Sequence, residues 1–217
     1  NNTISNCTAG SSVPAIFLLG GVGTSNVTVS NNTISASNSG INISGNTSSS
    51  TLDTITISSN TITTVGSGSG VTIDDIAGNY AGTNITISNT TITSTNNVGL
   101  GGNGITVSDL ASGSSVTLTG NTVSGAGDNN LLIGDITGTI NITNGSYNSS
   151  LNGIGVSLAG ASAVTLTGVT ITGNNVGLSL AGTRTIGLSI SDSTISNSTT
   201  ADIQTAASIP STGFYSR

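Results

Sequence analysis

Short runs of alternating apolar and polar residues recur at regular intervals along this 217-residue chain. The run Val27–Ile34 reads V-T-V-S-N-N-T-I, which is apolar, polar, apolar, Ser or Thr, two turn residues, Thr or Ser, apolar. Further copies begin at Ile55, Ile85, Val116, Ile140, Val164 and Leu188, in steps of 28, 30, 31, 24, 24 and 24 residues. Self-similarity at such a period indicates stacked supersecondary units, and we therefore predict a solenoid with one coil per repeat.

The alternation within each copy predicts which side chains face inward. Successive side chains of a strand point to opposite faces, so motif positions 1, 3 and 8 share the inner face, and positions 2, 4 and 7 share the outer face. The inner set is almost entirely Val, Ile or Leu, and the outer set is almost entirely Thr or Ser. Positions 5 and 6 are rich in Asn and Gly, which accept a left-handed backbone, and we expect a sharp corner there.

A second apolar pair follows each copy and predicts a third strand in every coil. The pairs are Ile41/Ile43, Val71/Ile73, Ile105/Val107, Leu131/Ile133, Ile154/Val156 and Val176/Leu178, with Ala201/Ile203 last. Each coil thus reads strand, corner, strand, loop, strand, and equivalent strands of successive coils should pair in parallel. We predict an all-β fold, a single right-handed parallel β-helix of about eight coils. One domain would cover residues 1–217, with 1–25 as a partial, atypical first coil and 204–217 as a C-terminal tail.

The repeat unit resembles a known class of protein. Over residues 1–203 its pattern, apolar-x-apolar-[ST]-N-N-T-apolar, is similar to the parallel β-helix repeats of the pectin-lyase-like superfold. In character it is closest to bacterial surface solenoids such as autotransporter passenger domains and adhesins. The superfold also includes pectate lyases, polygalacturonases and phage tailspikes, so the resemblance implies a fold and leaves the function open.

Composition narrows the range of functions. The formal net charge is −6, with only two cationic side chains and no His, which argues against nucleic acid as a partner because phosphate binding needs clustered Lys or Arg. The longest apolar run, Val13–Leu19, contains Pro14 and is too short to cross a bilayer. We therefore expect no membrane insertion by this segment.

Catalysis is not expected either. Resemblance to polygalacturonases implies a group of Asp on one face of the coil, but those enzymes also surround the Asp with His, Lys and Arg. A lyase reaction needs a basic residue to abstract a proton, and the two cations here are Arg184 and Arg217. A polysaccharide-degrading enzyme remains a remote alternative.

Three aspartates share one register just after the third strand of their coils. Asp75, Asp109 and Asp135 occur in I-D-D-I, V-S-D-L and I-G-D-I, so they should stack in neighbouring coils. Carboxylates about 5 Å apart repel one another unless they are solvated, protonated or bridged by a cation. The sequence is compatible with a Ca²⁺ column, since Ca²⁺ takes oxygen ligands; the alternative is three turn aspartates that point into water. No other cofactor is expected.

The outward motif positions suggest a binding face. Position 2 forms a predicted column, with Thr at residues Thr28, Thr56, Thr86, Thr117 and Thr165. Such arrays resemble the ice-facing surface of some β-solenoid antifreeze proteins, and a carbohydrate is the other ligand considered. The alternative is structural, because Thr is a natural uncharged residue on an exposed strand.

The ends of the chain suggest contacts with other coils. A β-helix finishes in unpaired strand edges, and an uncapped edge invites pairing. The predicted contact residues are Ile4, Phe17, Leu19 and Ile209. The partner would be another copy, stacked head to tail into a filament, or neighbouring coils of a longer chain. The bulky first coil also has a purely structural interpretation, a filled end layer of core.

Together these patterns predict a non-enzymatic structural segment of an extracellular or cell-surface protein, such as a stalk, an adhesin passenger or a fibre subunit. A glycan or a host surface would be its external partner. The main alternative is a carbohydrate- or ice-binding solenoid that uses its flat Thr/Ser face.

Overall fold

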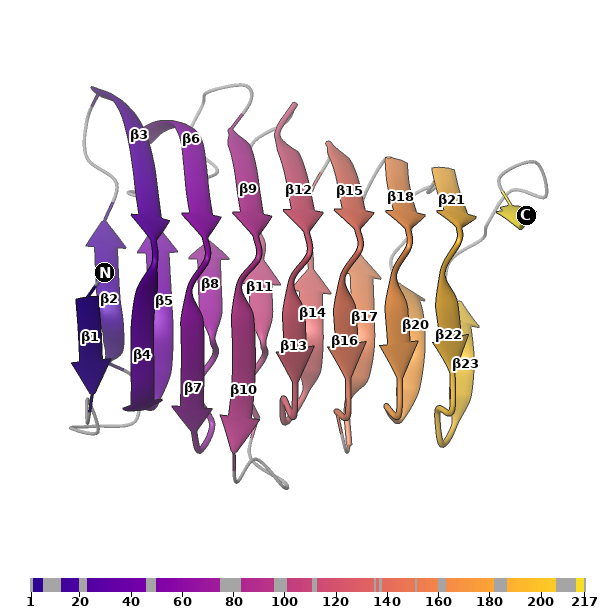
Figure 1. Cartoon of the computed structure of the whole chain (residues 1–217). Helices are drawn as coiled ribbons and strands as arrows, with labels where there is room; N and C mark the ends of the chain where they lie inside the picture. Colours follow the sequence, from indigo (N-terminus) through magenta and orange to yellow (C-terminus); the bar gives the residue numbers. More distant parts are fainter. Residues whose placement is uncertain are drawn as a thin grey trace.

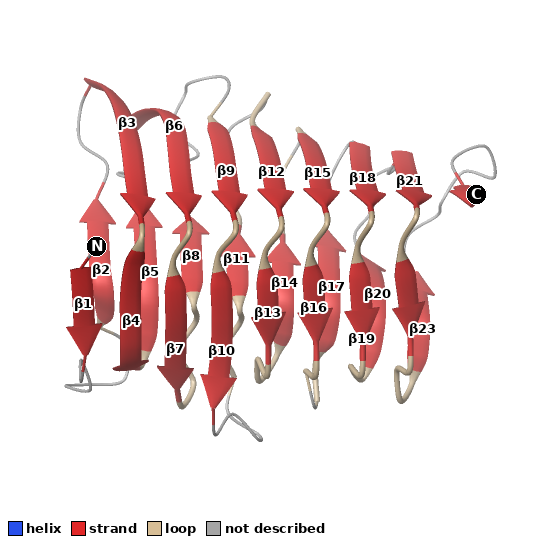
Figure 2. Ribbon diagram, in the orientation of Figure 1, coloured by secondary structure: helices blue, strands red, loops and turns tan. Residues whose placement is uncertain are grey.

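The computed structural model contains strands and turns, without a helix, over the residues that it describes (Figure 2). These residues are 2–5, 13–19, 23–45, 50–74, 83–95, 101–110, 113–134, 136, 138–150, 152–159, 163–181, 187–205 and 214–216. They form three eight-stranded sheets, which we call A, B and C. The predicted all-β solenoid is confirmed.

Each coil contributes one strand to each sheet. Sheet A contains β1 (Asn2–Ser5), β4 (Asn32–Ser37), β7 (Thr61–Val65), β10 (Thr91–Thr95), β13 (Thr122–Ser124), β16 (Ser146–Asn148), β19 (Thr170–Thr172) and β22 (Thr194–Ser196). Sheet B contains β2 (Pro14–Leu19), β5 (Ser39–Ser44), β8 (Val71–Asp74), β11 (Ile105–Val107), β14 (Asn129–Ile133), β17 (Ile154–Ala159), β20 (Val176–Ala181) and β23 (Ala201–Thr205). Sheet C contains β3 (Gly23–Ser30), β6 (Ser50–Ser58), β9 (Asn84–Ser88), β12 (Ser115–Thr119), β15 (Thr139–Thr143), β18 (Ala163–Thr167), β21 (Gly187–Ser191) and β24 (Phe214–Ser216).

The chain winds through the sheets in the order C, A, B, and then returns to C one coil further along (Figure 1). Every pairing is parallel, and equivalent motif positions are Cα partners: Val27 pairs with Ile55, and Val116 pairs with Ile140. The repeat in the sequence therefore sets the register of the sheets. The predicted order of strand, corner, strand, loop, strand is confirmed.

The inward-facing positions build one continuous core. In the second copy of the repeat, Ile55, Ile57 and Ile62 are all fully buried, and their counterparts along the rod belong to the same hydrophobic cluster. A fully buried side chain of this size contributes about 1.5–3 kcal/mol. No single coil has enough of them to offset the ordering of its backbone at about 1–2 kcal/mol per residue, so the coils stabilise one another.

The corner between sheets C and A differs in detail from the expectation. Only motif position 5 is left-handed, with φ between 49° and 64° at Asn31, Ser59, Asn89, Gly120, Asn144, Gly168 and Asp192. Position 6 instead points inward and is buried at Asn32, Asn60, Thr90 and Asn121. One left-handed residue is enough to turn the chain, and the next side chain is then free to satisfy backbone groups inside the corner.

A second set of buried polar side chains lies in the turns between sheets A and B in the later coils. The Nδ2 of Asn130 donates to Oδ1 of Asn174 (3.0 Å), and the backbone N–H of Ser150 donates to the same oxygen (2.9 Å). The Nδ2 of Asn174 in turn donates to the carbonyl of Tyr147 (3.0 Å). These bonds link three successive coils inside the rod.

The outermost strands lie at opposite ends of the rod in Figure 1. β1, β2 and β3 form one edge of the three sheets, and β22, β23 and β24 form the other. The range 204–217, expected as a tail, includes the end of β23 and all of β24, which pairs with β21 through Leu188 and Phe214.

Candidate binding surface

Sheet C presents the Thr column that the repeat suggested. Its partners in successive strands are Thr28, Thr56, Thr86, Thr117, Asn141, Thr165 and Ser189. Thr28 and Thr165 are exposed, whereas Thr56, Thr86 and Thr117 are half-buried. The structure thus brings the first four threonines together in register, while Asn141 separates Thr165 from them. Ligand binding by this column stays a prediction.

Sheet A carries a second and more regular column that the sequence reasoning did not single out. Its partners are Thr3, Thr33, Thr61, Thr91, Thr122, Ser146, Thr170 and Thr194. All of these threonines are exposed. The signal was present in the sequence, because motif position 7 is Thr in most copies.

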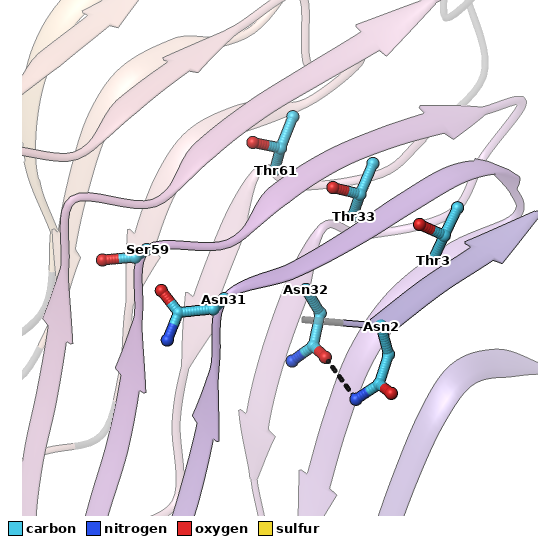
Figure 3. Close-up of a pocket in the computed structure, with 7 residues that line it drawn as sticks. All are labelled: Asn2, Thr3, Asn31, Asn32, Thr33, Ser59 and Thr61. Carbon is cyan, nitrogen blue, oxygen red and sulfur yellow. Dashed lines mark hydrogen bonds between the residues drawn. The ribbon is translucent and has the colours of Figure 1, made fainter.

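A depression of about 300 Å³ lies where sheets C and A meet, near the β1 end of the rod (Figure 3). The residues that line it are Asn2, Thr3, Asn31, Asn32, Thr33, Ser59 and Thr61. The first threonines of the sheet A column form one side of the depression, and the left-handed corner residues Asn31 and Ser59 form another side (Figure 3). All of its lining groups are uncharged amides, hydroxyls and backbone, so it offers hydrogen-bond donors and acceptors without a net charge.

The floor of the depression is fixed by an asparagine ladder. The Nδ2 of Asn2 donates to Oδ1 of Asn32 (3.1 Å), and both the backbone N–H and the Nδ2 of Asn32 donate to Oδ1 of Asn60 (3.0 and 3.1 Å). The Nδ2 of Asn60 donates to the carbonyl of Val29 (2.9 Å). Because Asn32 and Asn60 are buried, these bonds are shielded from water and hold the corner in one geometry.

Further along the rod, other residues take the place of asparagine in the ladder. Thr90 takes the next rung, where its backbone N–H donates to Oδ1 of Asn121 (3.0 Å). At Gly145 the ring of Tyr147 fills the space instead, since a Cβ on Gly145 would lie 2.7 Å from a ring carbon. Tyr147 is fully buried, and its hydroxyl has no hydrogen-bond partner in the described part of the chain.

Burial raises the pKa of Tyr147 far above its ordinary value of about 10, because the phenolate would lose its hydration inside the rod. The nearby amide of Asn121 opposes this shift by a smaller amount, although the two groups do not meet hydrogen-bond geometry. Tyr147 therefore stays protonated in the folded rod at any physiological pH.

The structure describes only one residue of the predicted Asp column. Asp109 is exposed and left-handed, with φ of 51°, while Asp75 and Asp135 lie outside the described residues. Within the described ranges no group of three His, Cys, Asp or Glu side chains could hold a metal ion. The Ca²⁺ column stays a prediction, and an increase in melting temperature on addition of Ca²⁺ that is lost in the triple Asp→Asn variant would check it.

The predicted contact residues occupy different environments. Phe17 and Leu19 are 56% and 63% exposed on the outer face of β2, whereas Ile4 is half-buried against the core. Ile209 lies outside the described residues. Among the elements that the structure describes, no helix has the length and apolar character needed to cross a membrane.

Comparison with known families agrees with this architecture. The family model described as "Right handed beta helix region" matches residues 1–154. Searches among curated proteins and among solved structures gave no match. The match covers well over half of the chain and the coils that it spans continue in register to residue 216, so the chain belongs to the right-handed β-helix family.

Proposed function

We propose that this chain is a non-enzymatic, rod-like structural segment of an extracellular or cell-surface protein. The observation that carries the proposal is the uninterrupted architecture. Three parallel sheets run from the first coil to the last around one core, so the molecule is built to hold its two ends apart. The likeness of its repeat to bacterial surface solenoids supports the location.

The side-chain chemistry supports a structural role over catalysis. With no His and two cations in the whole chain, few groups can transfer a proton near neutral pH. Long stretches of the surface are instead Thr, Ser and Asn, which are nearly inert in water. A polysaccharide-degrading activity is therefore the weaker candidate.

Self-association is part of this proposal. Among the described residues, the strands at either end of each sheet pair with another strand on one side only, and such an edge can accept another parallel strand in the same register. The coil that completes an edge would come from a longer chain or from a second copy stacked head to tail. A head-to-tail contact that does not close into a ring propagates as a filament.

Ligand binding by the flat face of sheet C is a second candidate, favoured by the in-register pairing of Thr28, Thr56 and Thr86. The two candidate ligands of this face are ice and carbohydrate. Thermal hysteresis and ice-crystal shaping test the first ligand: unchanged crystals at high protein concentration would remove ice from consideration.

The location is tested in cells that produce the full-length protein. An epitope placed in the turn at Asn197, which is exposed, should react with antibody on intact cells as strongly as on permeabilised cells. Labelling only after permeabilisation would contradict the surface location.

The absence of catalysis needs a separate assay. The purified chain is incubated with pectate and with neutral polysaccharides, and both new reducing ends and unsaturated products are measured. We expect no product above that of heat-denatured protein. Product formation that is lost on denaturation would overturn the structural role.

A further inference from the structure

We propose that the depression at the corner of sheets C and A is a binding site for an uncharged, hydroxyl-rich ligand, namely a short stretch of a neutral glycan. The site is distinct from the sheet C face and does not depend on the rod being a stalk. It combines a hollow of suitable size, free hydrogen-bonding groups at its rim and a rigid floor.

The rim supplies the groups that would contact the ligand. The hydroxyls of Thr3, Thr33 and Thr61 form no hydrogen bond with another described residue, and the same holds for the side chains of Asn31 and Ser59. Figure 3 shows the three threonines in a row on neighbouring strands, beside the two corner residues. The spacing of strands in a sheet places consecutive hydroxyls about 4.8 Å apart. Each hydroxyl both donates and accepts, as the hydroxyls of a sugar do.

The floor holds the rim groups in place, so they would bind a ligand without first rearranging. Asn2 and Asn32 are already occupied by the ladder, with Asn32 bonded to both of its neighbours. The backbone N–H of Asn31 also donates to the carbonyl of Ser58 in the next coil (3.1 Å). The rim groups are therefore mounted on a backbone that is fixed before the ligand arrives, which lowers the entropy lost on binding.

Size and charge select the ligand class. About 300 Å³ is at the lower end of small-molecule sites and corresponds to about ten water molecules. The lining has no cation to pair with a carboxylate, so an acidic glycan would lose hydration without compensation. A neutral glycan segment fits both conditions.

The test compares two double variants of the purified chain. Thr33→Val with Thr61→Val removes two rim hydroxyls while keeping shape and strand preference. Thr122→Val with Thr170→Val removes two exposed hydroxyls of the same column outside the depression. The probes are immobilised uncharged hexasaccharides built from glucose, mannose, galactose or xylose, beside hexagalacturonate. The strongest neutral probe is then titrated calorimetrically, and thermal melting confirms that both variants are folded.

We expect at least one neutral hexasaccharide to bind the native chain and hexagalacturonate to bind more weakly. The rim variant should bind the neutral probe roughly 10-fold more weakly or worse, since each lost neutral hydrogen bond reduces affinity several-fold. The control variant should match the native chain. Three outcomes would overturn the site: no neutral probe binds, hexagalacturonate binds best, or both variants weaken binding equally. Ice-crystal shaping that depends on Thr33 and Thr61, without glycan binding, would also refute it.

Discussion

At the scale of single residues, the corner column shows how one position controls the next coil. Gly120 is left-handed, with φ of 64°, and a Cβ placed on it would lie 2.6 Å from Oδ1 of Asn89 in the preceding coil. Gly168 stands in the same relation to Asn144, at 2.5 Å. From Asn89 to Gly168, Asn and Gly alternate at this corner, and the amide of each Asn lies close to the backbone of the Gly in the following coil.

This arrangement predicts the effect of replacing Gly120. Gly120→Ala should lower the free energy of unfolding by about 1–3 kcal/mol, because Ala is strained in the left-handed region and its Cβ meets the Asn89 amide. Asn89→Gly removes the steric part only, so the double variant should recover part of the loss. Urea unfolding of the four proteins in this cycle measures the coupling. Strictly additive effects would show that the close contact carries no energy.

Tyr147 leads to a prediction about pH. Above pH 10 the unfolded chain releases the Tyr147 proton while the folded chain keeps it, because burial raises the folded pKa. The unfolded state then binds fewer protons, so stability falls as pH rises, by about 1.4 kcal/mol per pH unit for this one group. At lower pH the group contributes no slope.

Tyr147→Phe keeps the ring and removes both the titration and the unpartnered hydroxyl. We expect stability at pH 7 to be unchanged or to rise by about 1 kcal/mol, and the decline above pH 10 to be shallower than in the native chain. Denaturant unfolding from pH 7 to pH 11.5 measures both. A parallel decline in the two proteins would show that Tyr147 is not the titrating group.

At the scale of strands and corners, buried polar ladders act together with the apolar core. The first coils are joined at the corner between sheets C and A through Asn2, Asn32 and Asn60. Later coils are joined at the turn between sheets A and B through Asn130 and Asn174. The coil of β12 to β14, in the middle of the rod, has a buried Asn at each place, Asn121 and Asn130.

Asn60 provides the test of the ladder. It is 1% exposed, and Asn60→Ala removes the acceptor of the Asn32 N–H and the side-chain donor to the carbonyl of Val29. Unpaired buried groups cost about 1–3 kcal/mol each, so we expect a loss of about 3 kcal/mol by thermal or urea unfolding. Thr61→Ala, one residue away on the exposed side, is the control and should cost well under 1 kcal/mol. Comparable losses would mean that the ladder adds nothing to stability.

The sequence predicted the strands and their faces because Val, Ile and Leu at positions such as 55, 57 and 62 repeat with the period of a strand. It did not predict that Asn32 points inward, because in a pair of consecutive Asn residues at a turn either side chain could be the one that points inward. The depression was also missed. Thr33 is on the face of sheet A and Asn31 is at the corner. These residues line the same depression only because sheets A and C meet at an angle.

At the scale of the whole molecule, the edges of the rod determine how it meets other coils. Among the described residues Phe17 and Leu19 are large apolar side chains that are more than half exposed, and both lie on the edge strand β2. Exposed apolar groups on an edge strand favour association.

Phe17→Asp should therefore reduce self-association of the purified 217-residue chain, because a charge on β2 disfavours close approach of another copy. Analytical ultracentrifugation over a wide concentration range, with electron microscopy, measures it. Thr165→Asp adds the same charge to an exposed site in mid-rod and serves as the control. If the native chain is monodisperse at high concentration and Phe17→Asp changes nothing, stacking through this end is wrong.

The parallel pairing also determines how the rod responds to a pulling force. Its backbone hydrogen bonds between coils lie along the long axis, so tension on the two ends loads the rows of bonds in series, one coil interface after another. The weakest interface opens first. In the later coils equivalent residues such as Val116, Ile140 and Val164 are 24 positions apart, and each released coil would add about 80 Å of extended chain. The rod would therefore lengthen stepwise under tension and absorb mechanical work with each coil that it releases.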